Sequence, residues 1–238
     1  MAGPWLYHLA SGSMRRLPEP ELMEAQAQVA AYAAADFSEP NERFCALFQQ
    51  RVPEFANGGI IDLGCGPADI PIQLALTYVG SRVYAVDGSA AMLDHARRAA
   101  VARGVDQRIE LIRWRIGRTP VPCALTAAGD AVISNSLLHH LADPRALWTA
   151  VRACAAPGAA VLVMDLCRPA SNDAARALVE QYAADEPPIL KRDFCNSLCA
   201  AYREDEVRGQ LVTAGLAGFA VKRVSDRHLV VFGRLPRR

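Results

Sequence analysis

Short apolar runs alternate with helical patterns between residues 58 and 166, and this alternation is the feature that most constrains the fold. Runs that are short and apolar throughout are typical of strands buried on both faces, as in parallel sheets. The segments between them have helical spacing. The alternation therefore predicts a doubly wound α/β sheet. The expected parallel strands are 58–63, 82–87, 109–113, 131–134 and 159–166.

The C-terminal part of the chain breaks this alternation. Residues 167–202 show no strand pattern, contain two consecutive prolines and carry mixed charge, so we expect a helical insertion that serves the substrate. Runs at 219–224 and 228–232 predict an antiparallel hairpin. The complete expectation is a seven-stranded, mostly parallel, Rossmann-like sheet with a terminal antiparallel hairpin. Residues 1–45, rich in helix formers, are expected to form a helical cap, and residues 46–238 the main domain.

Composition excludes several classes of protein. The chain has 26 basic and 25 acidic side chains, so it lacks the basic excess that non-specific nucleic-acid binding requires. No uncharged stretch is long enough to cross a bilayer, and we expect a cytoplasmic protein without a membrane or nucleic-acid partner. Seven cysteines include no Cys-x-x-Cys pair, and Cys195 and Cys199 lack a third ligand nearby. We therefore expect no metal; the sequence does not indicate an oligomeric state.

A glycine-rich turn follows the first expected strand, where residues 62–69 read Asp-Leu-Gly-Cys-Gly-Pro-Ala-Asp. In an open parallel sheet, ligands bind beyond the carboxyl ends of the strands. Gly64 and Gly66 permit a tight turn and a close approach of ligand to backbone. Dinucleotide sites have a third small residue at the position of Asp69 and leave the turn uncharged for a pyrophosphate. Asp62 and Asp69 would instead favour a ligand that is cationic near this turn.

Asp87 ends the second expected strand, at the position where a carboxylate accepts both hydroxyl groups of a ribose. The alternative role, capping the next helix, is already supplied by Ser89. The turn and Asp87 together call for an adenosine-like nucleoside that carries positive charge and no phosphate. S-adenosylmethionine meets these requirements.

Three segments, in the expected order and spacing, resemble motifs of the class I S-adenosylmethionine-dependent methyltransferases, in the branch of small-molecule methylases. They are Ile-Ile-Asp-Leu-Gly-Cys-Gly-Pro at 60–67, Val-Tyr-Ala-Val-Asp-Gly-Ser at 83–89, and Ala-Val-Ile-Ser-Asn-Ser-Leu-Leu-His-His-Leu at 131–141. The resemblance implies that the methionine part of the cofactor lies at the glycine turn, its ribose at the second motif and its methyl group near the third. The implied cofactor-binding residues are Asp62, Gly64, Cys65, Gly66, Asp87, Gly88, Ser89, Met92, Asn135, Ser136 and Leu137.

Two positions depart from the family pattern. Relatives usually carry an acidic residue after the third strand to accept the adenine amino group, but residues 113–116 read Arg-Trp-Arg-Ile here. Adenine is then expected to contact the backbone or to stack on Trp114. Ala68 stands where relatives usually have glycine.

Methyl transfer is an in-line displacement, so alignment of the acceptor is the main catalytic requirement, and a base is needed only where the acceptor must lose a proton. His139, His140 and Asn135 are the candidate catalytic residues, since imidazole titrates near neutral pH. A helix-capping or packing role for the two histidines stays open. Specificity is expected from the least regular segments. The candidate substrate-binding residues are Tyr32, Asp36, Phe37, Arg192 and Asn196, although a core role for the two aromatic residues and a solvated turn around Arg192 are alternatives.

The best-supported function is methylation of a small molecule. An RNA or protein methyltransferase of the same fold is an alternative, but it would call for a basic surface or an added recognition module. A partner protein that binds the cofactor without catalysis is another. A short-chain dehydrogenase is excluded, because neither Lys191 nor Lys222 has a tyrosine four residues before it.

Overall fold

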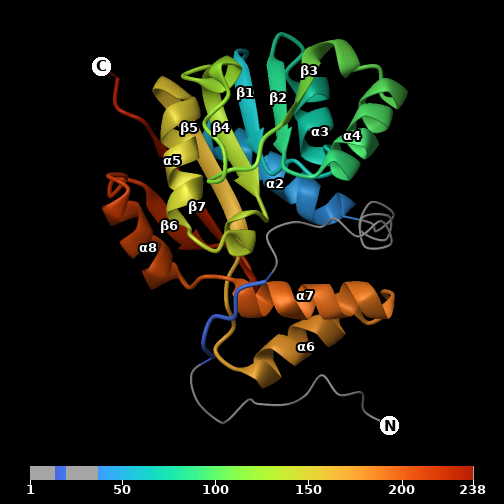
Figure 1. Cartoon of the computed structure of the whole chain (residues 1–238). Helices are drawn as coiled ribbons and strands as arrows, with labels where there is room; N and C mark the ends of the chain where they lie inside the picture. Colours follow the sequence, from blue (N-terminus) through green and yellow to red (C-terminus); the bar gives the residue numbers. More distant parts are fainter. Residues whose placement is uncertain (1–13, 20–36, 238) are drawn as a thin grey trace.

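The computed structural model describes residues 14–19 and 37–237. Its centre is a seven-stranded sheet with the strand order β3-β2-β1-β4-β5-β7-β6, shown in Figure 1. The first five strands along the chain are parallel, and β7 runs antiparallel to both β5 and β6. This arrangement confirms the expected fold class. The strands are β1 (Gly59–Leu63), β2 (Arg82–Asp87), β3 (Ile109–Arg113), β4 (Gly129–Asn135), β5 (Ala155–Leu166), β6 (Ala220–Arg223) and β7 (His228–Arg234).

Strands β4 and β5 begin earlier than their apolar runs. Gly129 pairs with Ala155, ahead of a register shift between Gly129 and Ala131. Helix α5 (Arg145–Cys154) accordingly ends at the residue before β5 begins. The expected start of β5 at residue 159 is corrected to Ala155, because backbone pairing continues beyond the apolar side chains that mark the buried part of the strand.

Helices cover both faces of the sheet. One face packs against α2 (Ser38–Arg51), α3 (Asp69–Thr77) and α4 (Ala90–Ala102), and the other against α5 and α8 (Glu204–Thr213). Helix α2 runs through the expected boundary at residue 45, since Phe44 and Phe48 are both fully buried in the core of the first face. The described part of the N-terminal region therefore packs with the sheet.

The expected helical insertion consists of α6 (Asn172–Ala183) and α7 (Pro188–Ala200). The two helices share a small apolar cluster with Met14 and Leu166, and Figure 1 shows them across the end of the sheet where the parallel strands stop. None of the helices in the described ranges has the length and apolar character needed to cross a bilayer. Three short 3-10 helices complete the described elements: η1 (Asp106–Arg108), η2 (Cys123–Leu125) and η3 (Leu138–His140).

The contribution of the core beneath α5 to stability can be tested at Trp148. Trp148 is fully buried, and its Nε1–H donates a hydrogen bond of 3.0 Å to Gln210 Oε1. Trp148→Ala removes that bond and leaves a cavity, so we expect the free energy of unfolding to fall by about 3–5 kcal/mol. Denaturant unfolding measures the loss. Val212→Ala, at a site 65% exposed, is the control and should change the value by less than about 0.5 kcal/mol; equal losses in the two variants would contradict the assignment.

Candidate functional site

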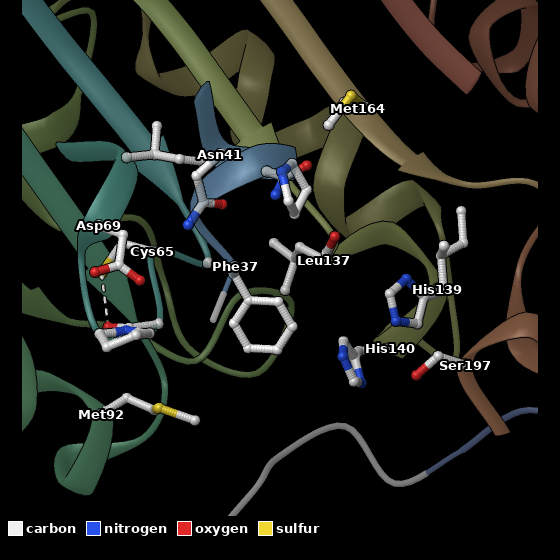
Figure 2. Close-up of a pocket in the computed structure, with 18 of the residues that line it drawn as sticks. Phe37, Asn41, Cys65, Asp69, Met92, Leu137, His139, His140, Met164 and Ser197 are labelled. Carbon is white, nitrogen blue, oxygen red and sulfur yellow. Dashed lines mark hydrogen bonds between the residues drawn. The ribbon is translucent and has the colours of Figure 1, made fainter. Parts of the chain in front are cut away.

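A cavity of about 440 Å³ opens at the carboxyl ends of the parallel strands. Its walls come from the loops after β1, β2, β3 and β4, the first turn of α2, and helices α6 and α7. In Figure 2, Cys65, Asp69 and Met92 lie on one side and His139, His140 and Ser197 on the other, with Phe37 and Leu137 between them. The cavity lies where the topology of the sheet predicts a ligand site.

Both glycines of the turn after β1 have backbone conformations that favour glycine. Gly64 has φ +80° and Gly66 has φ +54°. The N–H groups of Gly64 and Cys65 both donate to the Val86 carbonyl, at 2.8 and 2.9 Å, and so fix the turn against β2. A Cβ on residue 64 would lie 3.0 Å from the Leu137 side chain, whereas one on residue 66 would meet nothing within 4 Å. The turn thus leaves open space at Gly66, on the wall of the cavity.

Ala68 occupies a left-handed conformation, with φ +70°, directly before α3. An alanine in this region costs about 1 kcal/mol relative to glycine. The departure from the family pattern at this position therefore stores local backbone strain next to the cavity.

Asp87 organises the turn and faces the same cavity. Its Oδ2 accepts from Gly66 N–H at 2.9 Å, and its Oδ1 accepts from Ser89 N–H at 2.8 Å. Burial raises the pKa of Asp87, and these backbone donors oppose the rise. Each carboxylate oxygen has a further acceptor site, so Asp87 can also bind hydroxyl groups of a ligand. Ser89 caps α4 as expected, because its Oγ accepts from Met92 N–H at 3.4 Å.

Asp62 is the least satisfied acid of the site. It is 2% exposed, and within the described ranges its Oδ1 has no hydrogen-bond partner. Burial, and then the negative charge of Asp87, raise the pKa of Asp62 to about 8. Because a buried carboxylate without a partner is costly, this arrangement favours a cationic group bound nearby.

The end of β4 supplies the wall opposite the glycine turn. Ser134 Oγ–H donates to the Leu63 carbonyl at 2.7 Å and ties the strand to β1. Asn135 Oδ1 is buried and, among the described residues, has no hydrogen-bond partner. Ser136 has φ +57°, and its N–H donates to the Met164 carbonyl at 3.0 Å. This strained end of the strand lines the cavity together with Leu137.

The residues after β3 line the cavity at the positions where relatives usually carry an acidic residue. Trp114 lines the cavity but is only 4% exposed, and its Nε1–H donates to the Thr119 carbonyl at 3.1 Å. Ile116, Arg115 and Arg118 line the same wall. The indole nitrogen is thus committed to the protein, and stacking on the ring stays a prediction.

His139 is held by a buried carboxylate that the sequence analysis did not select. Its Nδ1 lies 2.5 Å from Asp165 Oδ1, and Asp165 also accepts the N–H groups of Leu138 and Leu166, each at 2.7 Å. Burial opposes charge on both groups, yet their mutual attraction wins: the pKa of Asp165 is lowered and that of His139 is raised. A lone acid near the end of an apolar strand was the available signal for Asp165.

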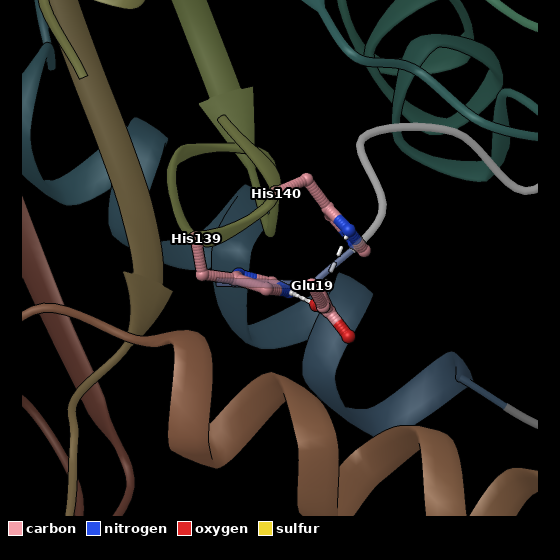
Figure 3. Close-up of side chains that lie close together, drawn as sticks. All are labelled: Glu19, His139 and His140. Atoms are coloured by element: carbon pink, nitrogen blue, oxygen red, sulfur yellow. Dashed lines mark ion pairs between the residues drawn. The ribbon is translucent and has the colours of Figure 1, made fainter. Parts of the chain in front are cut away.

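Glu19 also enters the site and was missed. Its Oε1 lies 3.5 Å from His139 Nε2 and 3.2 Å from His140 Nδ1, as Figure 3 shows, and accepts from Ser197 Oγ at 3.0 Å. Burial raises the pKa of Glu19. No motif surrounds this residue in the sequence, so only the folded chain brings it to the histidines.

The candidate substrate residues are placed unevenly. Phe37 lines the cavity, while Tyr32 and Asp36 lie outside the described residues. Arg192 and Asn196 are exposed on α7 and are not part of the cavity wall. Arg192 instead pairs with Asp193 at 3.0 Å. The residues of α7 that do line the cavity are Leu190, Asp193, Phe194 and Ser197.

Comparisons with known proteins agree with this geometry. Residues 60–159 match the model of a family described as a methyltransferase domain. A trans-aconitate 2-methyltransferase from Paracidovorax citrulli is 33% identical over 113 residues, which cover 48% of this chain and 40% of that protein. A tRNA 5-carboxymethoxyuridine methyltransferase from Escherichia coli (strain K12) is 30% identical over 109 residues, 44% of this chain and 39% of that protein. The matches span about two fifths of these curated relatives.

The fold has counterparts among solved structures. A SAM-dependent methyltransferase from Aquifex aeolicus superposes with a TM-score of 0.60 at 18% identity, covering 90% of this chain and 100% of that one. At this level of identity the likeness shows a shared fold.

The raised pKa of Asp62 gives a prediction for stability. An acid whose pKa is higher in the folded state than in the unfolded state destabilises the fold increasingly as pH rises from about 4 to 8. Asp62→Asn removes the charge with little change in shape. We expect this variant to have a higher free energy of unfolding than the wild type at pH 8, by at least about 1 kcal/mol, and a smaller gain at pH 5.

Denaturant unfolding at the two pH values measures the difference. Asp94→Asn, at an exposed site on α4, is the matched control and should show no such gain at pH 8. A loss of stability in Asp62→Asn at pH 8 would contradict the assignment of an unsatisfied buried charge.

Proposed function

We propose that this chain, whose residues 60–159 match a family described as a methyltransferase domain, transfers a methyl group from S-adenosylmethionine to a small-molecule acceptor. One observation carries the proposal. A single cavity joins an acidic, glycine-lined wall at β1 and β2 to a wall that bears His139 and His140, and helices α6 and α7 supply part of its lining. Cofactor and acceptor would meet inside this cavity.

The residues of the first wall fit the cofactor. S-adenosylmethionine carries an ammonium group, a sulfonium group and a ribose, and it has no phosphate. Asp62 Oδ1 and Asn135 Oδ1 are buried acceptors without a hydrogen-bond partner in the described chain, as a cationic ligand requires. Space for the ligand exists at Gly66, where a Cβ would meet no atom within 4 Å. The open acceptor sites of Asp87 suit the ribose hydroxyl groups.

The proposed contacts follow the family pattern. The methionine part is assigned to Asp62 and the turn backbone, the ribose to Asp87, the adenine to the start of α4, and the reacting end to the residues after β4. Asp62, Asp87 and Asn135 lie at or next to the last residue of β1, β2 and β4, Met92 lies in the first turn of α4, and the other residues lie in the loops that follow these strands. The full set proposed to hold the cofactor is Asp62, Gly64, Cys65, Gly66, Asp87, Gly88, Ser89, Met92, Asn135, Ser136 and Leu137.

The bound cofactor supplies an electrophilic methyl group on a sulfonium, and the protein supplies alignment and shelter from water. We assign acceptor contact to His140, whose side chain is 17% exposed at the cavity. His139 has a side chain that is only 3% exposed and is anchored to Asp165, so it acts as a positioning residue. Phe37 and Leu137 lie between the two walls and border the path of the methyl group.

A small acceptor is favoured over RNA. The relatives include a trans-aconitate methyltransferase and a tRNA methyltransferase, so family membership alone does not decide between these classes. The cavity lining mixes the acids Glu186 and Asp193 with the basic residues Arg115, Arg118 and Arg227, and the 26 basic side chains of the chain are balanced by 25 acidic ones. RNA binding depends on a clustered positive surface, which this charge balance does not favour.

Cofactor binding tests the first part of the proposal. Calorimetry should show binding of S-adenosylhomocysteine with a Kd in the micromolar range, of order −8 kcal/mol. Asp87→Ala removes the ribose acceptor and loosens the glycine turn, so we expect at least a tenfold weaker Kd. Asp94→Ala, on the exposed face of α4, is the control and should bind as the wild type does. Absence of binding by the wild-type chain would overturn the assignment.

Turnover tests the second part. We expect the chain with S-adenosylmethionine to form S-adenosylhomocysteine when given a panel of small carboxylic acids, phenols and amines, and not when given bulk tRNA. His140→Ala should lower kcat/KM for the responding acceptor at least tenfold, and His95→Ala on α4 should not. Activity confined to tRNA would overturn the small-molecule proposal, and binding without turnover across both panels would support a non-catalytic role.

A further inference from the structure

Three potential metal ligands lie close together at the cavity wall that bears His139 and His140, which we call the acceptor wall. They are Glu19 Oε1, His139 Nε2 and His140 Nδ1, which all lie within 4.8 Å of one another. Figure 3 shows both imidazole rings directed at the same carboxylate. No metal is expected from the sequence alone, because Cys195 and Cys199 have no third ligand nearby and Glu19 is distant from the histidines along the chain.

The spacing of these atoms matches that of a coordination sphere. Metal–nitrogen and metal–oxygen bonds of about 2.0–2.1 Å in a tetrahedral site place neighbouring ligand atoms about 3.4 Å apart. Glu19 Oε1 lies 3.5 Å from His139 Nε2 and 3.2 Å from His140 Nδ1. An ion can therefore contact all three groups with only small movements of the side chains.

The surroundings of His139 prepare it as a ligand. Its Nδ1 lies 2.5 Å from Asp165 Oδ1, which keeps a hydrogen on that nitrogen, so Nε2 is the atom whose lone pair is offered to a metal ion that displaces its proton. That lone pair faces a carboxylate oxygen of Glu19, so a cation between the two atoms satisfies both. A carboxylate that orients a ligand histidine through its other ring nitrogen is a common feature of metal sites.

The local charge also calls for a cation. Glu19, Asp165 and Asp193 all act on this cluster, and within the described residues Arg16 is the basic side chain that acts on His139. The Arg16 guanidinium is committed elsewhere, since it donates to three backbone carbonyl groups at 2.6–3.1 Å and lies 4.0 Å from the centre of the Tyr202 ring. An excess of negative charge in a buried site favours a divalent ion.

We propose that Glu19, His139 and His140 bind a divalent transition-metal ion with the ligand preferences of zinc or cobalt. Two imidazoles and one carboxylate suit such ions, and three protein ligands leave a coordination position open. Both histidines line the cavity, so that position is available to an oxygen atom of the acceptor. This last step rests on the proposed function, whereas metal binding itself does not.

Titration of the full chain with Zn²⁺ by calorimetry tests the site. We expect saturation near one ion per chain with a Kd below about 10 μM. Glu19→Gln keeps the shape but removes the charge, and His140→Ala removes one ligand at a partly exposed position; each should weaken binding at least tenfold. His95→Ala is the matched histidine control and should leave the affinity unchanged.

Cysteine thiols also bind zinc, so the titration is repeated in the Cys195→Ser/Cys199→Ser background, where the result should persist. S-adenosylhomocysteine binding, measured on each variant, verifies that the cavity is folded. The proposal is overturned if no saturable binding occurs, or if folded Glu19→Gln and His140→Ala chains both bind zinc as tightly as the wild type. Zinc binding without any cofactor binding would instead refute the proposed function and leave the metal site standing.

Discussion

Strands β2, β1 and β5 each bring a carboxylate to the same end of the sheet, and the site depends on how far each carboxylate is satisfied. Asp165 on β5 accepts three hydrogen bonds at 2.5–2.7 Å, and its pKa is lowered. Asp87 on β2 accepts two backbone N–H groups and keeps acceptor sites open. Asp62 on β1 has an unpartnered buried oxygen within the described chain, and its pKa is raised to about 8. A buried charge requires compensation. We therefore infer a structural role for Asp165, whose bonds are made within the protein, and a ligand-binding role for Asp62, with Asp87 between the two.

The fold supports these unsatisfied groups with packing elsewhere. Ala68, directly before α3, and Ser136, directly after β4, both hold left-handed conformations. Strain of this kind persists only where the surrounding structure determines the backbone. The two apolar layers, with Trp148 on one face and Phe48 on the other, provide that support. The strained residues of the site lower the stability of the fold, and the packing of the two cores on either side of the sheet offsets this loss.

The residues predicted to bind the cofactor do line one cavity, because they are close together along the chain and carry recognisable turn chemistry; cofactor binding by them stays a prediction. The wall that bears His139 and His140 is different, since Glu19 reaches His139, and Ser197 reaches Glu19, from distant segments without any motif. The selection of Arg192 and Asn196 shows a second limit. They are polar residues of the expected insertion, but the cavity is lined by Asp193 and Ser197, one position further along α7. A shift of one residue turns a helical side chain by about 100°, and composition alone cannot fix that phase.

The net charge of the cavity wall that bears His139 and His140 depends on whether a proton or a metal ion lies between Glu19 and His139. A proton between the carboxylate and the imidazole leaves the acids of the wall largely uncompensated, which favours a neutral or cationic acceptor. A divalent ion in the same position displaces that proton and adds an open coordination site, which favours an acceptor that offers an oxygen. The same three side chains can thus select opposite acceptor charges, depending on what they hold. We expect this choice to leave the glycine turn unchanged, because Cys65 and Asp69 lie on the other side of Leu137 from the two histidines (Figure 2).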